Sequence, residues 1–451
     1  MICFLLSPFG SVWGQSAVTF SGEVKSSLDG IFSGDDFDSV LNPSNYLGFG
    51  DLASSQSAVF KLEGANLDAD FGGANDGFRL WASLKSYPVG AALMGLASSI
   101  PVPPASESDW DPVANPFLVV SELNTLLGDN ILSLDLMRLS YTWSPGSFSL
   151  TLGRQSFLTG YGYGWNPMDL VSPLKDPADP EADKRGVDGA SISWDSGYPL
   201  SVKLYGLYNG DGTGVDAWEE LKGGGEINLL LPVAEVKASV LWGRDMDTAT
   251  GNPNGAGVGF LVDLMGAGLY GEGAVRQYAR RSDPGVSGSG ESVLYTLESG
   301  EEWVFSALGG IEYYLPAGTA LIFEYFYNGE GFDQPDRTVY KDALESYGAT
   351  GTIPSAWSSL YRPGYLAKQY VLVNILHSFW DPFQVDLSLT ALGSPDSGAL
   401  SGIGSLTLYP SGSLSFSLGY AGLFSFDDEK YNEAWLSPVQ HIISLSAAYG
   451  F

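Results

Sequence analysis

The sequence predicts an all-β protein: a transmembrane antiparallel up-and-down β-barrel of about 18 strands, with 16 as the alternative count. Three features predict it: segments of about ten residues that alternate apolar and polar side chains, connections that are alternately short and long, and a last strand that ends on an aromatic residue. Residues 15–451 would form this single domain. The sequence has no uninterrupted apolar stretch of about 20 residues, the length that a membrane helix needs. A closed barrel is the other way to satisfy the backbone in lipid.

The composition agrees with many short strands and turns. Only 16% of the 451 residues are charged, and Gly (58), Tyr (24) and Phe (23) are plentiful. The net charge of −31 argues against nucleic acid as a partner, because phosphates need a basic face. The one cysteine, Cys3, excludes a disulfide framework and a cysteine metal site.

The first fourteen residues resemble the end of a secretory signal. Ile2–Leu6 is apolar, and Val12 and Gly14 are the small residues that precede a cleavage site. The basic beginning of such a signal is missing, so 1–14 is read as a signal-peptide remnant. An ordinary hydrophobic terminus is the alternative.

Period-two segments give the strands. In residues 382–392, Phe383, Val385 and Leu387 fall on one face, whereas Asp386 and Ser388 fall on the other. A length near ten residues fits a tilted strand that crosses a membrane. Strands are predicted to start near residues 17, 55, 77, 131, 146, 186, 198, 222, 233, 255, 266, 301, 318, 367, 382, 398, 412 and 438.

The connections predict the two ends of the barrel. Tight turns such as Ser144–Ser147, Met265-Gly266 and Pro410–Gly412 alternate with long loops. Short periplasmic turns and long extracellular loops are typical of an outer-membrane barrel, and an even strand number puts both termini in the periplasm. The long loops would be 29–54, 88–130, 156–185, 209–221, 244–254, 277–300, 329–366 and 422–437.

The last strand points to a family. Ile443, Leu445, Ala447, Tyr449 and Phe451 share one face, with small and polar residues on the other. In this it resembles Gram-negative outer-membrane proteins. The resemblance implies a location in the bacterial outer membrane, contact with its lipid, and recognition of the strand ending in Phe451 by the barrel assembly machinery.

Residues on the polar faces would line a water-filled lumen, because so many charges could not stay dry and unpaired. One wall would be mainly basic and the other mainly acidic, an arrangement that favours dipolar solutes. Structural ion pairs between strands are the alternative reading. The basic wall would hold Lys25, Lys61, Arg79, Lys85, Arg138, Lys203 and Lys237, with Glu23, Glu63 and Glu226; the acidic wall would hold Asp263, Glu272, Glu312, Glu324 and Asp386, with Arg276.

The glycine-rich stretch Gly153-Arg154-Gln155, followed by Gly160–Pro167 and Asp169, enters a long loop. It resembles a Gly-Arg-Gln…Asn-Pro…Asp stretch of porin-like and polysaccharide-exporting barrels, in which this loop often folds into the barrel. The resemblance implies a constriction formed by Arg154, Gln155 and Asp169, and a slide for sugar rings formed by Tyr161, Tyr163 and Trp165. A turn-rich surface loop is the alternative.

The loop 88–130 is expected to plug the lumen or cover its rim. Apolar residues such as those of Val89–Leu96 and Phe117–Val120 are unusual in an extracellular loop. The sequence does not distinguish the plug from the cover.

An enzyme is not expected. The two histidines, His377 and His441, have no metal-binding partners at recognisable spacing and no serine and acid set beside them, so neither a metal nor another cofactor is predicted. The sequence therefore predicts a porin for passive or weakly selective diffusion of small hydrophilic solutes, ions included, as a monomer or homotrimer. A saccharide exporter, or a plugged surface barrel acting as an adhesin, is the alternative.

Overall fold

The computed structural model describes most of the predicted barrel. The described residues are 17–32, 51–65, 75–88, 122–127, 130–208, 221–243, 254–277, 283–287, 294–298, 303–316, 318–349, 355–358, 360–379, 383–426, 432–437 and 441–451. The predicted signal remnant 1–14 and most of the predicted plug 88–130 lie outside them. Among the described helices, none combines the length and apolar character that a membrane crossing requires.

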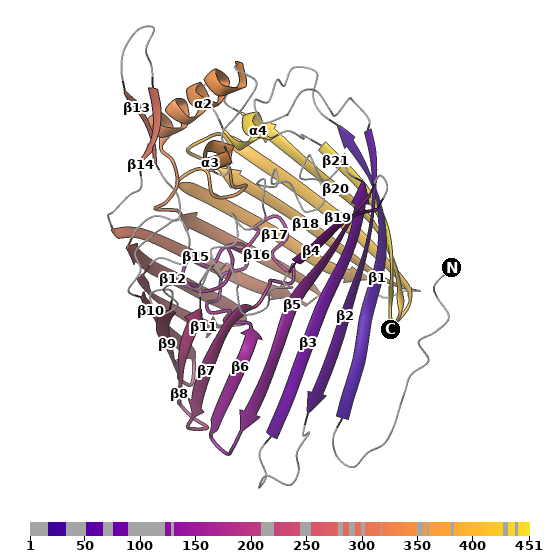
Figure 1. Cartoon of the computed structure of the whole chain (residues 1–451), viewed down its shortest axis with the longest axis vertical. Helices are drawn as coiled ribbons and strands as arrows, with labels where there is room; N and C mark the ends of the chain where they lie inside the picture. Colours follow the sequence, from indigo (N-terminus) through magenta and orange to yellow (C-terminus); the bar gives the residue numbers. More distant parts are fainter. Residues whose placement is uncertain are drawn as a thin grey trace.

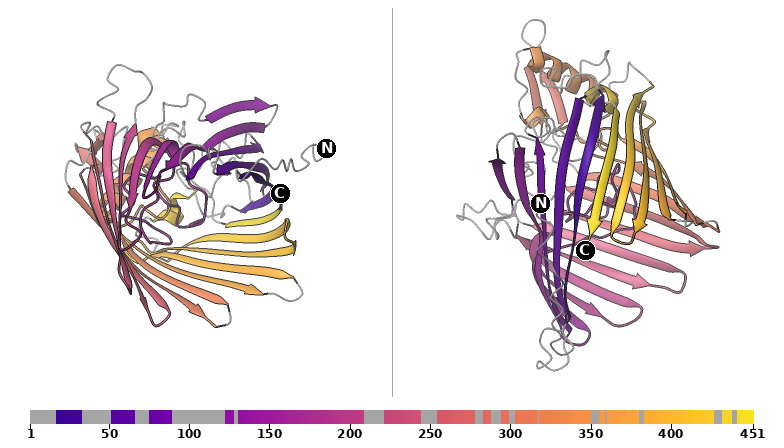
Figure 2. Two further views of the ribbon diagram at one scale, coloured as in Figure 1. Left: turned by 90° about the horizontal axis from the view of Figure 1, so that it is seen from below. Right: turned by 90° about the vertical axis from the view of Figure 1, so that its right-hand side faces the viewer.

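One antiparallel sheet of 19 strands closes on itself (Figures 1 and 2). Strand β4 (Glu122–Leu127) pairs only with β5, so 19 − 1 = 18 strands form the ring. The predicted all-β barrel of about 18 strands is therefore confirmed, and each predicted strand starts within a few residues of an observed one. The ring consists of β1 (Ala17–Phe32), β2 (Asp51–Ala65), β3 (Asn75–Pro88), β5 (Asn130–Ser144), β6 (Phe148–Gln155), β7 (Val187–Asp195), β8 (Leu200–Tyr208), β9 (Leu221–Leu230), β10 (Ala234–Gly243), β11 (Gly255–Leu264), β12 (Ala267–Gln277), β15 (Trp303–Leu315), β16 (Thr319–Tyr327), β17 (Gln369–Phe379), β18 (Gln384–Ser394), β19 (Ala399–Ser411), β20 (Leu414–Ser425) and β21 (His441–Gly450).

The two faces of the wall differ as the period-two pattern predicts. In β16, Phe323 and Tyr325 are 46% and 41% exposed on the outside, whereas Glu324 and Phe326, which alternate with them, are buried on the inside. Apolar side chains that face outward around a closed ring fit hydrocarbon, because every backbone group is paired within the sheet.

The barrel closes where the first strand meets the last. β1 pairs with β2 on one side and with β21 on the other. Gly22 and Phe451 exchange two backbone hydrogen bonds of 3.0 Å. The Phe451 ring lies 5.7 Å from the Phe20 ring and 6.4 Å from the Phe60 ring, centroid to centroid. The terminal aromatic residue therefore covers the closing seam.

We expect Gly22→Val to weaken this seam. A Cβ at Gly22 would lie 2.5 Å from the Val59 carbonyl oxygen and 2.7 Å from the Phe451 ring, so the strands must separate. The matched control Gly309→Val lies in β15 with no atom within 4 Å of its Cβ. Heat-modifiability on gels should show the Gly22→Val barrel unfolding several degrees below both the parent and the control. Equal transition temperatures for the two variants would contradict this role of the seam.

Connections differ between the two ends of the barrel. At one end the turns are tight, as at Met265-Gly266, where both φ angles are positive (54° and 83°) as in a two-residue type I′ hairpin. The other end carries further elements that the sequence analysis did not predict (Figure 1). These are β4, β13 (Asp283–Ser287), β14 (Leu294–Glu298), α2 (Gln334–Ala349), α3 (Ser355–Ser358) and α4 (Glu433–Leu436). Among the described connections, the turn between β18 and β19 departs from the alternation, because it is short and lies at this end.

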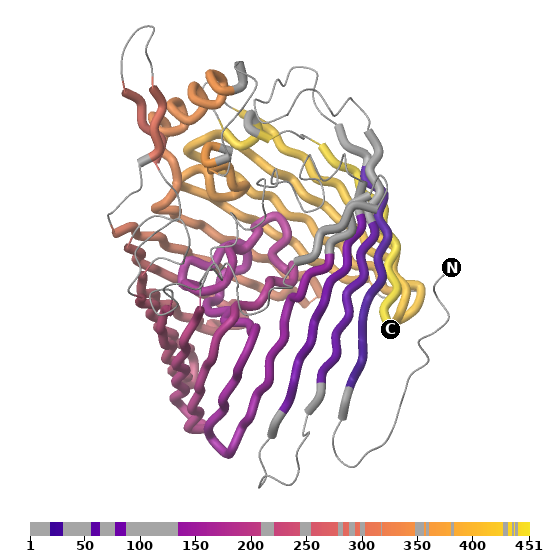
Figure 3. The backbone as a smooth tube through the Cα atoms, in the orientation of Figure 1, coloured from indigo at the N-terminus to yellow at the C-terminus, as the bar shows by residue number. Residues whose placement is uncertain are grey.

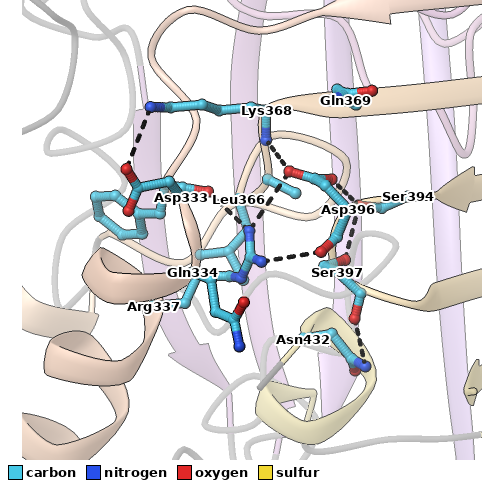
Figure 4. Close-up of polar contacts among 12 residues, drawn as sticks. Asp333, Gln334, Arg337, Leu366, Lys368, Gln369, Ser394, Asp396, Ser397 and Asn432 are labelled. Atoms are coloured by element: carbon cyan, nitrogen blue, oxygen red, sulfur yellow. Dashed lines mark hydrogen bonds and ion pairs between the residues drawn. The ribbon is translucent and has the colours of Figure 1, made fainter. Parts of the chain in front are cut away.

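That short turn ties neighbouring long loops together (Figure 4). Asp396 in the turn pairs with Arg337 of α2 at 3.6 Å and accepts a hydrogen bond of 3.1 Å from the Lys368 backbone N–H. Asn432, next to α4, donates to the Ser397 carbonyl at 3.1 Å. α2, the turn 395–398 and the segment 432–437 are therefore connected, and we call them together the cap.

Candidate functional site

The candidate site is the long connection between β6 and β7, residues 156–186, which enters the barrel (Figures 2 and 3). We call this segment the inserted loop. Its centre is completely buried, with Trp165 and Met168 at 0% exposure. It therefore packs against inward-facing side chains of the wall.

Two carboxylates of the wall hold the backbone of the inserted loop. Glu272 of β12 accepts hydrogen bonds from the backbone N–H groups of Tyr161, of Gly162 at 2.7 Å and of Met168 at 3.2 Å. Glu324 of β16 accepts from the N–H groups of Tyr163 and of Gly164, the latter at 2.7 Å. Hydrogen bonds to a charged acceptor are the strong ones, and these five satisfy groups that would otherwise be buried unpaired.

The alternating glycines allow the loop backbone to reach these two carboxylates. A Cβ at Gly162 would lie 1.9 Å from the Trp165 carbonyl oxygen, and one at Gly164 would lie 2.6 Å from Leu372. Glycine at 162 lets the loop fold closely on itself, and glycine at 164 lets it approach the wall. The Gly-Tyr-Gly-Tyr-Gly pattern is therefore a requirement of the inserted loop.

Trp165 fixes the far end of this segment. Its ring stacks on Phe326 at 5.1 Å and lies 5.6 Å from Tyr370, and its indole N–H donates to the Gly364 carbonyl at 3.0 Å. With no exposed surface, Trp165 cannot contact a passing solute, so its predicted place on a sugar slide is not what the structure shows. It anchors the loop. Tyr161 and Tyr163 are partly exposed.

Cations hold the other side of the loop. The Lys237 ammonium lies 4.5 Å from the Tyr161 ring, and Lys203 lies 4.6 Å from the Phe157 ring. Arg276 donates to the Pro167 carbonyl at 2.8 Å. Three predicted lumenal cations therefore serve to position the loop.

Lys175, within the loop itself, was not predicted as a site residue. Its ammonium donates to the Gly162 carbonyl at 2.8 Å, and burial lowers its pKa while neighbouring carboxylates raise it. The partly buried Tyr163 ring lies 5.8 Å away, and burial, then Glu181, raises the Tyr163 pKa to about 12. The tyrosine is therefore neutral at ordinary pH. A lysine in a loop gives no sequence signal for this contact.

The residues predicted to form the constriction are mostly internal. Arg154 is completely buried and forms a bidentate ion pair with Asp188 of β7, with hydrogen bonds of 3.0 and 3.1 Å. Gln155 is buried and accepts a hydrogen bond of 2.7 Å from Ser191. Asp169 is buried, and one carboxylate oxygen accepts from the N–H groups of Val171 and Ser172 at 3.2 and 2.9 Å. Arg154, Gln155 and Asp169 therefore stabilise the loop and its base.

A basic region lies on the inward faces of β2, β3 and β5. Register places Lys61, Trp81 and Arg138 side by side, and both cations lie 4.1 Å from the Trp81 ring. Next to them, Arg79 pairs with Glu63 at 3.4 Å, with side chains 61% and 41% exposed. This part of the lumen wall is open to solvent. Trp81 was not predicted here.

The edge of the inserted loop supplies acids that the sequence analysis did not predict as lumenal residues. Asp183 of the loop pairs with Lys61 of β2 at 3.5 Å, and Glu181 and Asp183 are exposed. Asp179 is also exposed, but partial desolvation by the surrounding protein raises its pKa, and the charge of Lys25 lowers it by less. We call Asp179, Glu181 and Asp183 the acidic edge. It lies next to the basic region.

The other predicted lumenal residues are dispersed. Lys25 and Lys85 align with Ser57 at one level of the wall, and Glu226 accepts a hydrogen bond of 2.6 Å from Thr159 of the inserted loop. Asp386 bonds Gln384 in its own strand, and Glu312 bonds Tyr314. Of the remaining predicted residues, Glu23 lies in β1 and Asp263 in β11.

Nothing in the described part of the chain assembles a metal site from three or more His, Cys, Asp or Glu side chains. His377 bonds Thr319 at 2.7 Å, and His441 lies 3.0 Å from the Tyr420 hydroxyl. Neither contact forms a set of nucleophile, base and acid.

No family model matches this chain, and no curated protein does. Among solved structures, Pseudomonas aeruginosa OccK5 (OpdH) is 10% identical, with a TM-score of 0.48 and coverage of 96% of this chain and 98% of that one. A Rhodopseudomonas blastica porin mutant is 9% identical, with a TM-score of 0.45 and coverage of 96% and 100%. Salmonella typhi OmpF, in a complex with daunomycin, is 10% identical, with a TM-score of 0.44 and coverage of 96% and 97%. These identities are too low to carry any residue's role to this chain.

Proposed function

We propose that this chain is a channel of the bacterial outer membrane through which small hydrophilic solutes diffuse, and that the inserted loop forms its constriction. One observation carries the proposal: the loop packs on one side of the lumen, while Arg79 and Glu63 on the other side keep 61% and 41% of their side chains exposed. Inward charges that remain exposed in a barrel of this width imply water inside.

The narrow part of the path would lie between the basic region and the acidic edge. The sequence analysis placed the acids on the opposite wall, but Glu272 and Glu324 of that wall are buried against the loop. The acids that face the basic region belong to the loop, as the contact of 3.5 Å between Lys61 and Asp183 indicates. Opposed charges create a transverse field that orients dipolar solutes and disfavours apolar ones.

Planar-bilayer recording of the purified protein tests the proposal. A channel should give discrete conductance steps, and steps that close in groups of three would indicate the homotrimer. Protein that inserts but stays silent and binds a glycan would instead support the alternative, a saccharide exporter or a plugged adhesin-like barrel. Partly exposed Tyr161 and Tyr163 are the feature that favours this alternative.

We expect neutralising variants to change ion preference in opposite directions. Removing three cations (Lys61→Gln, Arg79→Gln, Arg138→Gln) should raise the cation-to-anion permeability ratio about twofold or more, since a unit charge at 4 Å is worth about 1 kcal/mol even in water. Removing the three acids of the acidic edge should lower the ratio. Lys341→Gln, in α2 of the cap, should leave it unchanged. Reversal potentials in a salt gradient measure the ratio, and shifts of the same sign for both triples would contradict the opposed charges.

A further inference from the structure

A second cavity lies beside the inserted loop, under the cap. Inward-facing apolar side chains of four adjacent strands form its floor, among them Leu392, Ile403, Ala421 and Ile442. Pro177 of the inserted loop forms one side. This cavity is separate from the charged path between the basic region and the acidic edge.

The roof of the cavity is held rigidly by Glu433 of α4. Its buried carboxylate accepts hydrogen bonds from the backbone N–H of Gly364 at 3.2 Å, from that of Leu366 at 3.3 Å and from the Tyr370 hydroxyl. Tyr361, also in the roof, donates to the Glu433 carbonyl at 3.4 Å. These polar groups of the roof are therefore paired with each other, and most of the free surface of the cavity is apolar.

The size of the cavity selects the ligand. Its volume is about 160 Å³. An apolar cavity of roughly 150 Å³ holds a benzene-sized molecule without water. We propose that this cavity binds a benzene-sized apolar group that carries no negative charge.

The charge requirement follows from the lining. Among the described residues that line the cavity, Asp176 and Glu433 carry carboxyl groups, and none is a lysine or arginine. An anion would enter next to two acids and find no cation, so its desolvation would be uncompensated. A neutral ring has no charge to desolvate. An ammonium group near Asp176 has its desolvation offset by the carboxylate.

Three probes with the same ring and different charges test the site: phenol, benzylamine and benzoate. Ligand-observed NMR on the detergent-solubilised protein should show saturable binding of phenol and benzylamine, and at least tenfold weaker binding of benzoate. Ala421→Phe should abolish binding by filling the cavity. The matched control Ala448→Phe lies on the same lumenal face at the other end of β21, where it pairs with Lys25 and Ser415, and should bind as the parent does.

The outcomes are distinct. Binding that persists in Ala421→Phe would overturn the site, because the probe would then reside in detergent or elsewhere. Benzoate binding as tight as benzylamine binding would overturn the charge requirement, and no saturable binding of any probe would overturn the proposal. Because NMR needs no ion flow, a channel that fails to conduct in bilayers leaves this test intact. Heat-modifiability of both variants verifies that the barrels are folded.

Discussion

Replacing both Glu272 and Glu324 by alanine is expected to release the inserted loop and to raise single-channel conductance about twofold or more, because current through a narrow pore depends on its constriction. The two carboxylates accept five backbone N–H groups of the loop. Each such group left buried without a partner costs about 1–3 kcal/mol. The sum is large enough to move the loop, whereas the ring of strands keeps all its backbone bonds.

Glu312→Ala is the matched control for this double variant. Glu312 faces inward from β15, and its carboxylate accepts a hydrogen bond from the Tyr314 hydroxyl of its own strand, whereas Glu272 and Glu324 bond the backbone of the loop. Its conductance should equal that of the parent. A double variant with parental conductance and parental current noise would contradict the assignment of the loop as the constriction. Loss of heat-modifiability would show that the carboxylates are needed for assembly. In that case the conductance of the single variants Glu272→Ala and Glu324→Ala tests how each carboxylate holds the loop.

The strands could be predicted from the sequence because one physical rule governs all of them. Each wall residue faces either hydrocarbon or the interior, and neighbours along a strand alternate between the two, so polarity has period two. The cap shows where this rule ends. Asp333 caps the start of α2, because its carboxylate accepts the Asp336 N–H at 3.1 Å. The spacing of these two acids is a capping signal that the sequence analysis did not use.

The site was predictable in part. The resemblance carried by the glycine-rich motif implied a loop inside the barrel, with a surface loop as the alternative. Glu272, Glu324, Lys203, Lys237 and Arg276 were placed on the inward faces. Their partners were not predictable, because Glu324 and Tyr163 are 161 residues apart and nothing in either local sequence records the contact. Trp165 and Arg154 show the same problem. Their residue types suggested contact with solute, but burial in the folded chain makes them supports of the loop.

Arg154→Ala is expected to give the largest loss of stability. The Arg154 and Asp188 side chains are 0% and 3% exposed, and Arg154 also donates to the Leu136 carbonyl at 2.8 Å, so the pair joins β5, β6 and β7 at the base of the inserted loop. Removing one partner of a buried ion pair leaves an uncompensated charge and costs about 3–5 kcal/mol. Reversible urea unfolding in lipid vesicles measures this loss.

The double variant Arg154→Met with Asp188→Leu separates the charge effect from packing. Replacing a whole buried pair by apolar residues of similar volume is often close to neutral, so it should recover most of the stability that Arg154→Ala loses. Lys341→Ala breaks the more exposed pair with Glu345, at 2.9 Å, and should cost about 0.3–0.5 kcal/mol. If Arg154→Ala were no more destabilising than Lys341→Ala, the buried pair would not be what holds the base of the loop.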